Sequence, residues 1–244
     1  MLALCPSLAH AHQPRLVTGG MVDITNPEVS QAFYGELRGA PTAFRIKTDR
    51  DFRLYVGVLV PDIPGVRKDI SADITRITPS GNQQVALLDG PEFEWTPFFE
   101  TAAKDNYFWG PEFKALDSQT GIVLKGRLVQ AGTYVITVFS PDNLGKYSLA
   151  VGERDEFPLK EIIHAAVTVP RVKAQFFGYQ PLAILASPFG CGYLLAVYLI
   201  AFTVGLIVRA IVRRVAKNEP FSRPHNIGFT DRLIRAGLGI ALLG

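Results

Sequence analysis

Apolar and polar positions alternate over the N-terminal part of the chain, in short runs separated by turn residues. Phe52, Leu54 and Val56, for example, alternate with Arg53 and Tyr55, the period of two that a half-buried β-strand requires. Many short strands between regular turns are typical of a β-sandwich or barrel. The pattern predicts a mainly β domain over residues 15–152, with strands at Gln31–Leu37, Pro41–Thr48, Phe52–Val60, Ser71–Ile77, Gln84–Leu88, Gly121–Leu128, Gly132–Ser140 and Lys146–Val151.

A long apolar run replaces this alternation further along the chain. No charged residue occurs from Ala174 to Val208. The stretch Phe189–Val208 alone would form about 30 Å of helix, which matches the hydrocarbon thickness of a bilayer. Pro181 and Pro188 indicate that the helix proper begins near Phe189. We therefore predict one transmembrane helix within residues 181–209, with the lipid bilayer as a partner.

A helical period precedes the apolar run, at residues 157–178. Apolar residues recur there at spacings of three and four, which places them on one helical face. Pro170 is expected to break or kink this helix. The segment is predicted to be a juxtamembrane helix that links the β domain to the membrane, with one face formed by Leu159, Ile162, Ile163, Ala166 and Val167.

Basic residues directly after the apolar run orient the chain. Positive residues near a membrane helix stay on the cytoplasmic side, so the β domain is predicted to be extracytoplasmic. No comparable cluster precedes the run. The residues that carry this orientation are Arg209, Arg213, Arg214 and Lys217.

The first residues support the same orientation. Residues 1–13 contain a short apolar run followed by Ala9-His10-Ala11, an arrangement similar to the cleavage site of a secretory signal peptide. No Lys or Arg precedes the run. The segment therefore predicts export, and the patterns leave open whether it is cleaved and whether Met1 is the genuine start.

Composition and charge narrow the classes of function. The net charge is +3, but the basic excess lies in the tail beyond residue 180 rather than in the β domain, so no nucleic-acid partner is expected. Cys5 and Cys191 lie in different segments and form no disulfide framework. No catalytic triad, phosphate loop or metal-ligand spacing occurs. We expect no cofactor and no enzymatic activity.

An aromatic and acidic region, Pro91–Asp117, interrupts the predicted strands. Aromatic rings with acidic neighbours suit sugars, cations or peptide partners, which makes the region a candidate binding loop. The alternative is that the rings plug one end of the sandwich or pack on the membrane-proximal helix. The candidate binding patch consists of Phe93, Trp95, Phe98, Phe99, Tyr107, Trp109 and Phe113.

Two segments of the β domain resemble a known type of sandwich. Gly35–Ile46 resembles the opening of the jelly-roll sandwiches of the pre-peptidase C-terminal and Golgi-dynamics (GOLD) type. Ala131–Val138 and Gly145–Val151 resemble their closing hairpin. For residues 31–152 this resemblance implies a jelly-roll-like sandwich that serves as an accessory, binding or interaction module. It implies no catalytic residue.

The C-terminal end resembles the start of the YgaP-like transmembrane family. An Asn-x-Gly-x-x-Asp-Arg-x-x-Arg order leads there into an apolar, glycine-containing helix, carried by Asn226, Gly228, Asp231, Arg232, Arg235 and Gly239. The resemblance implies a bacterial inner membrane protein. It also implies that residues 210–244 form a cytoplasmic basic link and the start of a second membrane helix, which the chain truncates.

Three functions fit these patterns. The first is a membrane-anchored extracytoplasmic binding module, non-catalytic, whose partner is a protein or an envelope glycan. The second is an accessory or assembly subunit of a larger membrane complex, in which small residues of the transmembrane helix pack on another helix. The third is an envelope hydrolase, which the patterns favour least because acidic pairs such as Glu92 and Glu94 occur in any acidic loop.

Overall fold

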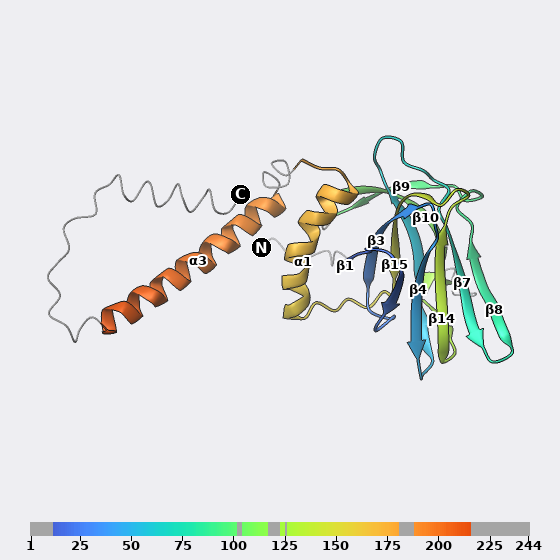
Figure 1. Ribbon diagram of the computed structural model, residues 1–244, viewed down its shortest axis with the longest axis horizontal. Coiled ribbons are helices and arrows are strands. Elements are labelled where there is room, and N and C mark those ends of the chain that lie inside the picture. The colour runs from blue at the N-terminus through green and yellow to red at the C-terminus, as the bar shows by residue number, and fades with distance from the viewer. Residues whose placement is uncertain (1–11, 102–103, 117–122, 125, 181–187, 216–244) are drawn as a thin grey trace, which may run out of the picture. The chain divides into compact units, whose positions relative to one another are not determined.

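The computed structural model describes residues 12–101, 104–116, 123–124, 126–180 and 188–215 (Figure 1). The chain divides into two units, Met1–Tyr193 and Leu194–Gly244. The first unit contains the strands and the helix predicted to be membrane-proximal, and the second contains most of a long apolar helix. Residues 1–11 of the predicted signal-like segment 1–13, Lys217 and the motif at residues 226–239 lie outside the described residues, while Gln13 begins strand β1 (Gln13–Leu16).

The β domain consists of two main sheets. The six-stranded sheet has the order β1 (Gln13–Leu16), β3 (Gln31–Arg38), β15 (Leu144–Val151), β6 (Val56–Pro61), β10 (Asp105–Phe113) and β9 (Thr96–Glu100). The five-stranded sheet has the order β2 (Met21–Ile24), β4 (Thr42–Thr48), β14 (Gly132–Phe139), β7 (Ser71–Thr78) and β8 (Gly81–Leu88). Within these two sheets β1 and β2 pair in parallel with β3 and β4, and the other pairings are antiparallel.

Two short pairs complete the strands. β5 (Phe52–Leu54) pairs with β13 (Arg127–Val129), and β11 (Ala115–Leu116) pairs with β12 (Val123–Leu124). The prediction of a mainly β domain is therefore confirmed. The predicted strand Gly121–Leu128 corresponds in part to β12 and β13, with residues 121, 122 and 125 outside the described part of the chain.

The main core lies between the two sheets. Phe33 of β3 packs edge to face on Phe44 of β4, with ring centroids 5.3 Å apart. Phe44 also contacts the ring of Tyr147 in β15. Ile136 and Val138 of β14, the central strand of the five-stranded sheet, are fully buried. Apolar side chains from both sheets thus form one continuous cluster, and its burial is the main stabilising contribution to the domain.

A second apolar cluster covers the outer face of the six-stranded sheet. There, rings and aliphatic side chains of the strands meet the segment predicted to be membrane-proximal, α1 (Leu159–Arg171) followed by the π-helical turn η1 (Val172–Phe176). In Figure 1, α1 lies beside β1 at the edge of this sheet. Pro170 lies inside α1, which continues to Arg171 and then into the π-helical turn η1. The predicted break at Pro170 is therefore not seen, and the helical hydrogen bonding changes to the π pattern just after the proline.

The apolar run forms helix α3 (Pro188–Val215). Within it, Gly190–Ile211 is the one helix of the described chain that is long and apolar enough to cross a membrane, by length and composition. The predicted span 181–209 overlaps this helix, which continues past Arg209 through Arg213 and Arg214. Residues 181–187 lie outside the described part.

The expectation of a loop at Pro91–Asp117 is wrong, because β9 and β10 occupy much of it. Asp105, Asn106, Gly110 and Pro111 are residue types depleted in strands, which obscures the alternation. The strand forms because β10 pairs on both edges, with β6 and with β9, and because both faces of its sheet are covered. Tertiary pairing here overrides local preference.

The assigned core predicts that the same substitution, isoleucine to alanine, lowers the free energy of unfolding much more on β14 than on the adjacent strand β7. Ile136→Ala on β14 removes a fully buried side chain and should lower the free energy of unfolding by about 2–5 kcal/mol. Ile77→Ala on β7 removes a side chain that is 40% exposed and should cost less than about 1 kcal/mol. Denaturant unfolding followed by the fluorescence of Trp95 and Trp109 measures both. Equal losses would contradict the assigned core.

Candidate functional site

The structure separates the aromatic residues of the predicted binding patch. Tyr107 and Phe113 are each 4% exposed, so the expectation that they form part of a solvent-facing patch is wrong. Phe113 faces the main core, and Tyr107 belongs to the outer cluster under the membrane-proximal segment. Period-two alternation alone would place residues 107 and 113 on the same face of the sheet. The pairing of β10 with β6 shifts register between Trp109 and Glu112, and an extra residue in one strand sends the following side chains to the opposite face.

Three further rings of the patch are partly buried. Trp95 packs against the main core and donates its indole N–H to the carbonyl of Gly90 at 2.9 Å. Phe98 and Trp109 pack edge to face in the outer cluster, with centroids 4.8 Å apart. The alternative that the rings plug the sandwich and pack on the membrane-proximal segment therefore describes most of them.

Only two rings of the predicted patch are exposed. Phe93 is 39% and Phe99 is 50% exposed. Phe93 also contacts the ring of Trp95 edge to face, which leaves Phe99 as the more accessible of the two. The remaining surface is too small to act as the continuous aromatic platform that the sequence suggested.

A buried ion pair fixes the membrane-proximal segment on the sheet. Lys173 Nζ of η1 donates to Asp105 Oδ1 at the start of β10 at 2.8 Å, and the two side chains are 7% and 3% exposed. Burial raises the pKa of the Asp105 carboxyl above its ordinary value, although the hydrogen bond from Lys173 acts in the opposite direction. The carboxylate is therefore tolerated in this place because Lys173 neutralises it.

Tyrosine hydroxyls extend this buried polar group across the sheet. The hydroxyls of Tyr34 and Tyr107 are 3.2 Å apart. Burial raises the pKa of Tyr34 to about 12 and that of Tyr107 well above its ordinary value, so both are neutral hydrogen-bonding groups. Phe176 and Phe177 cover them by edge-to-face contacts with the two tyrosine rings.

Polar contacts at the edges of α1 and η1 also hold these helices on the six-stranded sheet. Lys146 Nζ donates to the carbonyls of Gln175 and Phe176, both at 2.9 Å, and so binds carbonyl groups at the end of η1. Arg15 of β1 pairs with Glu161 of α1 at 2.8 Å. The segment from α1 to Phe177 is thus an integral layer of the β domain.

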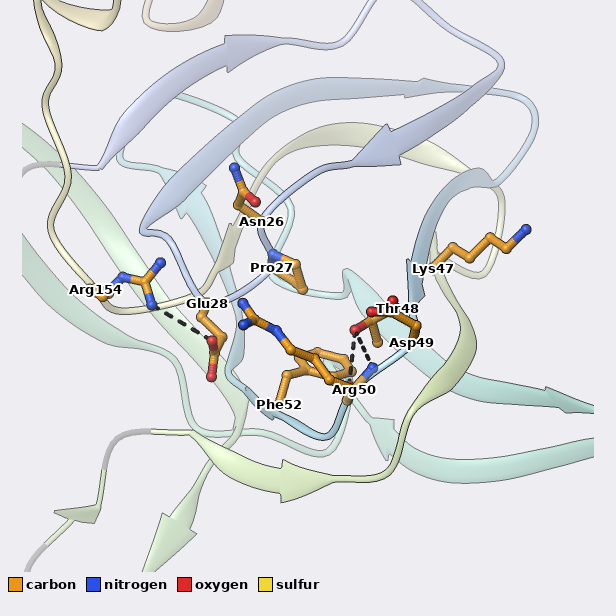
Figure 2. Close-up of a pocket in the computed structure, with 9 residues that line it drawn as sticks. All are labelled: Asn26, Pro27, Glu28, Lys47, Thr48, Asp49, Arg50, Phe52 and Arg154. Carbon is orange, nitrogen blue, oxygen red and sulfur yellow. Dashed lines mark hydrogen bonds and ion pairs between the residues drawn. The ribbon is translucent and has the colours of Figure 1, made fainter.

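The candidate ligand site is an open pocket of about 760 Å³ (Figure 2). It lies where three connections meet: the turn between β2 and β3, the turn between β4 and β5, and the chain after β15. The floor includes Phe52, whose ring is 2% exposed and packs on Tyr134. The lining consists of Asn26, Pro27, Glu28, Lys47, Thr48, Asp49, Arg50, Phe52 and Arg154.

The backbone around this pocket depends on one glycine. Gly152 has φ +73°, and an added Cβ would lie 2.3 Å from the carbonyl oxygen of Val29. Only glycine allows this approach without displacement. The chain can then run alongside the β2–β3 turn, where Arg154 N donates to the carbonyl of Glu28 at 2.9 Å. Arg154 is thereby fixed at one side of the pocket.

The charged side chains of the pocket differ in how they are paired. Arg154 donates through Nε to Glu156 at 2.7 Å and lies 3.7 Å from Glu28. Glu28 also accepts the backbone N–H of Arg53 at 3.0 Å. The Arg50 side chain makes no ion pair with any described residue, and Figure 2 shows it extending toward the side formed by Glu28 and Arg154. Arg50 is therefore a cation available to a ligand on this side of the pocket, whereas Lys47, which also lines the pocket, extends away from Glu28 and Arg154 in Figure 2.

Sequence reasoning missed both the pocket and the buried pair. Their signals were modest: a cluster of charges at Lys47–Asp51, and Lys173 as the last charged residue before the apolar run. Among the described residues no group of three or more His, Cys, Asp or Glu is placed to hold a metal ion. Glu92 and Glu94 are both exposed.

The fold defines the class of this chain as a mainly β protein with one apolar helix of membrane-spanning length. No family model matches the sequence, and no curated protein matches it. Among solved structures it is similar to the pre-peptidase C-terminal domain of a collagenase from Bacillus anthracis, with a TM-score of 0.28 and 8% identity, covering 58% of this chain and 95% of that chain. That neighbour is of the same type as one resemblance predicted for residues 31–152.

The buried pair predicts a pH-dependent loss of stability in Lys173→Met. Without the ammonium group, the folded pKa of Asp105 rises further above its unfolded value near 3.8. The carboxyl is then neutral in both states at low pH, and the cost of ionising it in the folded state grows as pH rises through the folded pKa. The destabilisation should be small at about pH 4 and reach about 3–5 kcal/mol at about pH 7.

The double variant Asp105→Asn/Lys173→Met is the control for this experiment. It contains no ionisable group at the pair, so its stability relative to the wild type should recover part of the loss at neutral pH and lack the added pH dependence. Denaturant unfolding at both pH values measures the effect. A loss in Lys173→Met that does not change with pH would contradict the electrostatic origin.

Proposed function

We propose that the chain is a membrane-anchored, extracytoplasmic and non-catalytic binding module with a jelly-roll-like sandwich, located in a bacterial inner membrane. The observation that carries the proposal is the packing of α1 and η1 on the six-stranded sheet through the buried Lys173–Asp105 pair. The helical segment that ends at Phe177, about ten residues before the apolar helix, belongs to the folded domain. Such an arrangement suits a domain that presents a surface at a fixed attachment to the membrane.

The pocket around Arg50 is the proposed binding site, and an acidic protein segment is the proposed partner. A guanidinium group binds a carboxylate through two parallel hydrogen bonds, and Arg50 makes no ion pair with a described residue. Sugar rings are usually bound on exposed aromatic faces. Phe52, the aromatic residue of the pocket lining, is 2% exposed, which favours a peptide carboxylate over a glycan.

The absence of a catalytic role is supported by the position of the perturbed carboxylate. A hydrolase needs a carboxyl group of raised pKa in an accessible concave site. The carboxyl of raised pKa in the described chain, Asp105, is 3% exposed and paired with Lys173 under the membrane-proximal segment. It serves packing rather than proton transfer.

An accessory subunit of a membrane complex is the second candidate. None of the apolar stretch of the candidate span is buried by other residues of the described chain. An added Cβ at Gly192 or Gly205 would meet no atom within 4 Å. Small residues of this kind allow close approach of a second helix. This function predicts that the full chain co-purifies with another membrane protein through α3, independently of Arg50.

Ligand binding should depend on Arg50. Full-length protein in nanodiscs is tested by fluorescence anisotropy against acidic peptides and against the same peptides with Asn, Gln and an amidated terminus. Arg50→Ala should weaken binding of the acidic peptides about 10- to 100-fold, the range for a lost hydrogen-bonded charge. The matched control Arg38→Ala removes an exposed cation elsewhere and should have little effect. Unchanged binding in Arg50→Ala, or selective binding of acidic oligosaccharides, would contradict this partner.

The orientation is tested by cysteine labelling in intact cells. In a background lacking Cys5 and Cys191, Leu128→Cys on β13, which is 65% exposed, should react with a membrane-impermeant maleimide added outside the inner membrane. Lys217→Cys should react only after permeabilisation, because the basic segment is expected inside. The reverse pattern would overturn the proposed topology.

A further inference from the structure

The outward face of α1 is an uncovered aliphatic surface. Its large side chains are exposed to solvent in the folded domain: Leu159 at 71%, Ile162 at 54%, Ile163 at 60% and Val167 at 50%. Exposing several large apolar side chains on one short helix is unfavourable, at about 1.5–3 kcal/mol for each side chain left fully unburied. Clusters of this kind mark a contact surface.

The three sides of α1 differ in chemistry. At 100° per residue, the aliphatic residues form one continuous side of the helix. The opposite side packs on the domain through Thr168 and, at the margin, through the pair of Glu161 with Arg15. Between these two sides, on one border of the aliphatic face, lie Lys160, His164 and Arg171, all exposed.

We propose that the aliphatic face of α1 inserts into the surface of an anionic bilayer, with Lys160 and Arg171 at the level of the lipid headgroups. The proposal rests on the membrane anchoring proposed above and adds a second, separate contact with the lipid. An apolar face bordered by basic residues is the composition of helices that lie in the plane of the membrane interface. Long basic side chains reach from such a depth to the headgroups.

Chain connectivity selects the bilayer over other partners. Residues 178–187 join the end of the docked segment to Pro188, the first residue of α3. Fully extended, this link reaches about 35–40 Å. If α3 spans a membrane, α1 is held near that membrane at all times, whereas a second copy or another protein must first be recruited. Because the bilayer would always be within reach of α1, covering the aliphatic face with lipid would cost less entropy than recruiting another protein.

The docking of α1 would then orient the β domain. Since η1 is fastened by Lys173 and Asp105, and since α1 continues into η1 without a break, the aliphatic face has a fixed direction relative to the sheet. Insertion of that face therefore holds the domain in one orientation over the lipid rather than letting it turn on its link.

Site-specific fluorescence of the full chain tests this contact. In the background without Cys5 and Cys191, Ile163→Cys and Val167→Cys are labelled with an environment-sensitive nitrobenzoxadiazole dye. The protein is reconstituted into vesicles of phosphatidylglycerol and phosphatidylcholine, with and without nitroxide-labelled lipid. Leu128→Cys, an exposed aliphatic position on β13, is the matched control, and Leu199→Cys on α3, 52% exposed, is the internal standard for the membrane span.

The expected result is that labels at positions 163 and 167 show blue-shifted emission and are quenched by nitroxide lipid, as at position 199, whereas the label at position 128 is not. In Lys160→Gln/Arg171→Gln, quenching at position 163 should decrease in vesicles containing phosphatidylglycerol and change little in phosphatidylcholine alone. The same quenching in both proteins and both lipids would overturn the role of the basic border.

Other outcomes separate this proposal from the anchoring itself. Quenching at position 199 but not at position 163 would overturn the interfacial contact and leave the anchored module standing. No quenching at either position would overturn the anchoring as well. A blue shift at position 163 without lipid quenching, lost when the protein is diluted to one copy per vesicle, would show that a second copy covers the face and would also overturn the proposal.

Discussion

The pair of Lys173 with Asp105 joins two parts of the chain that lie far apart in sequence. One partner begins a strand of the six-stranded sheet, and the other lies in the last helical turn before the apolar run. Two charges removed from water in this way are tolerated only together. Their position fixes where η1 lies, and with it the cover over the tyrosines of the outer face and the direction of α1.

The proposed ligand pocket and the membrane-proximal helix are linked by the same short stretch. Arg154 lines the pocket, Glu156 bonds both to the Arg154 side chain and, through its carbonyl, to Gln13 of β1 at 2.6 Å, and Leu159 begins α1. A partner that displaces Arg154 would therefore act on the chain only a few residues from the surface proposed to contact lipid. The pocket and α1 are thus joined by one short stretch of chain.

Alternation of apolar and polar residues predicted strands, and composition predicted the apolar helix. The alternation of Phe52, Leu54 and Val56 indicated strand structure, and all three are buried. The single strand predicted over Phe52–Val60 is, however, divided into β5 and β6, which belong to different sheets. The uncharged run after Ala174 indicated a membrane-length helix, and α3 has that length and composition. By contrast, β10 was missed, because covering both faces of its sheet removes the alternation and leaves Gly110 and Pro111 to suggest a loop.

The sequence by itself determined the mainly β class, the apolar helix and the amphipathic segment before it, since each depends on residues close together in the chain. Only the tertiary structure decided that Tyr107 and Phe113 are buried, that Asp105 meets Lys173, and that Glu28, Arg50 and Arg154 border one pocket. These residues come together through pairing between strands distant in sequence. The spacing of residues along a chain records local periodicity, whereas burial and charge pairing depend on which surfaces the fold brings into contact.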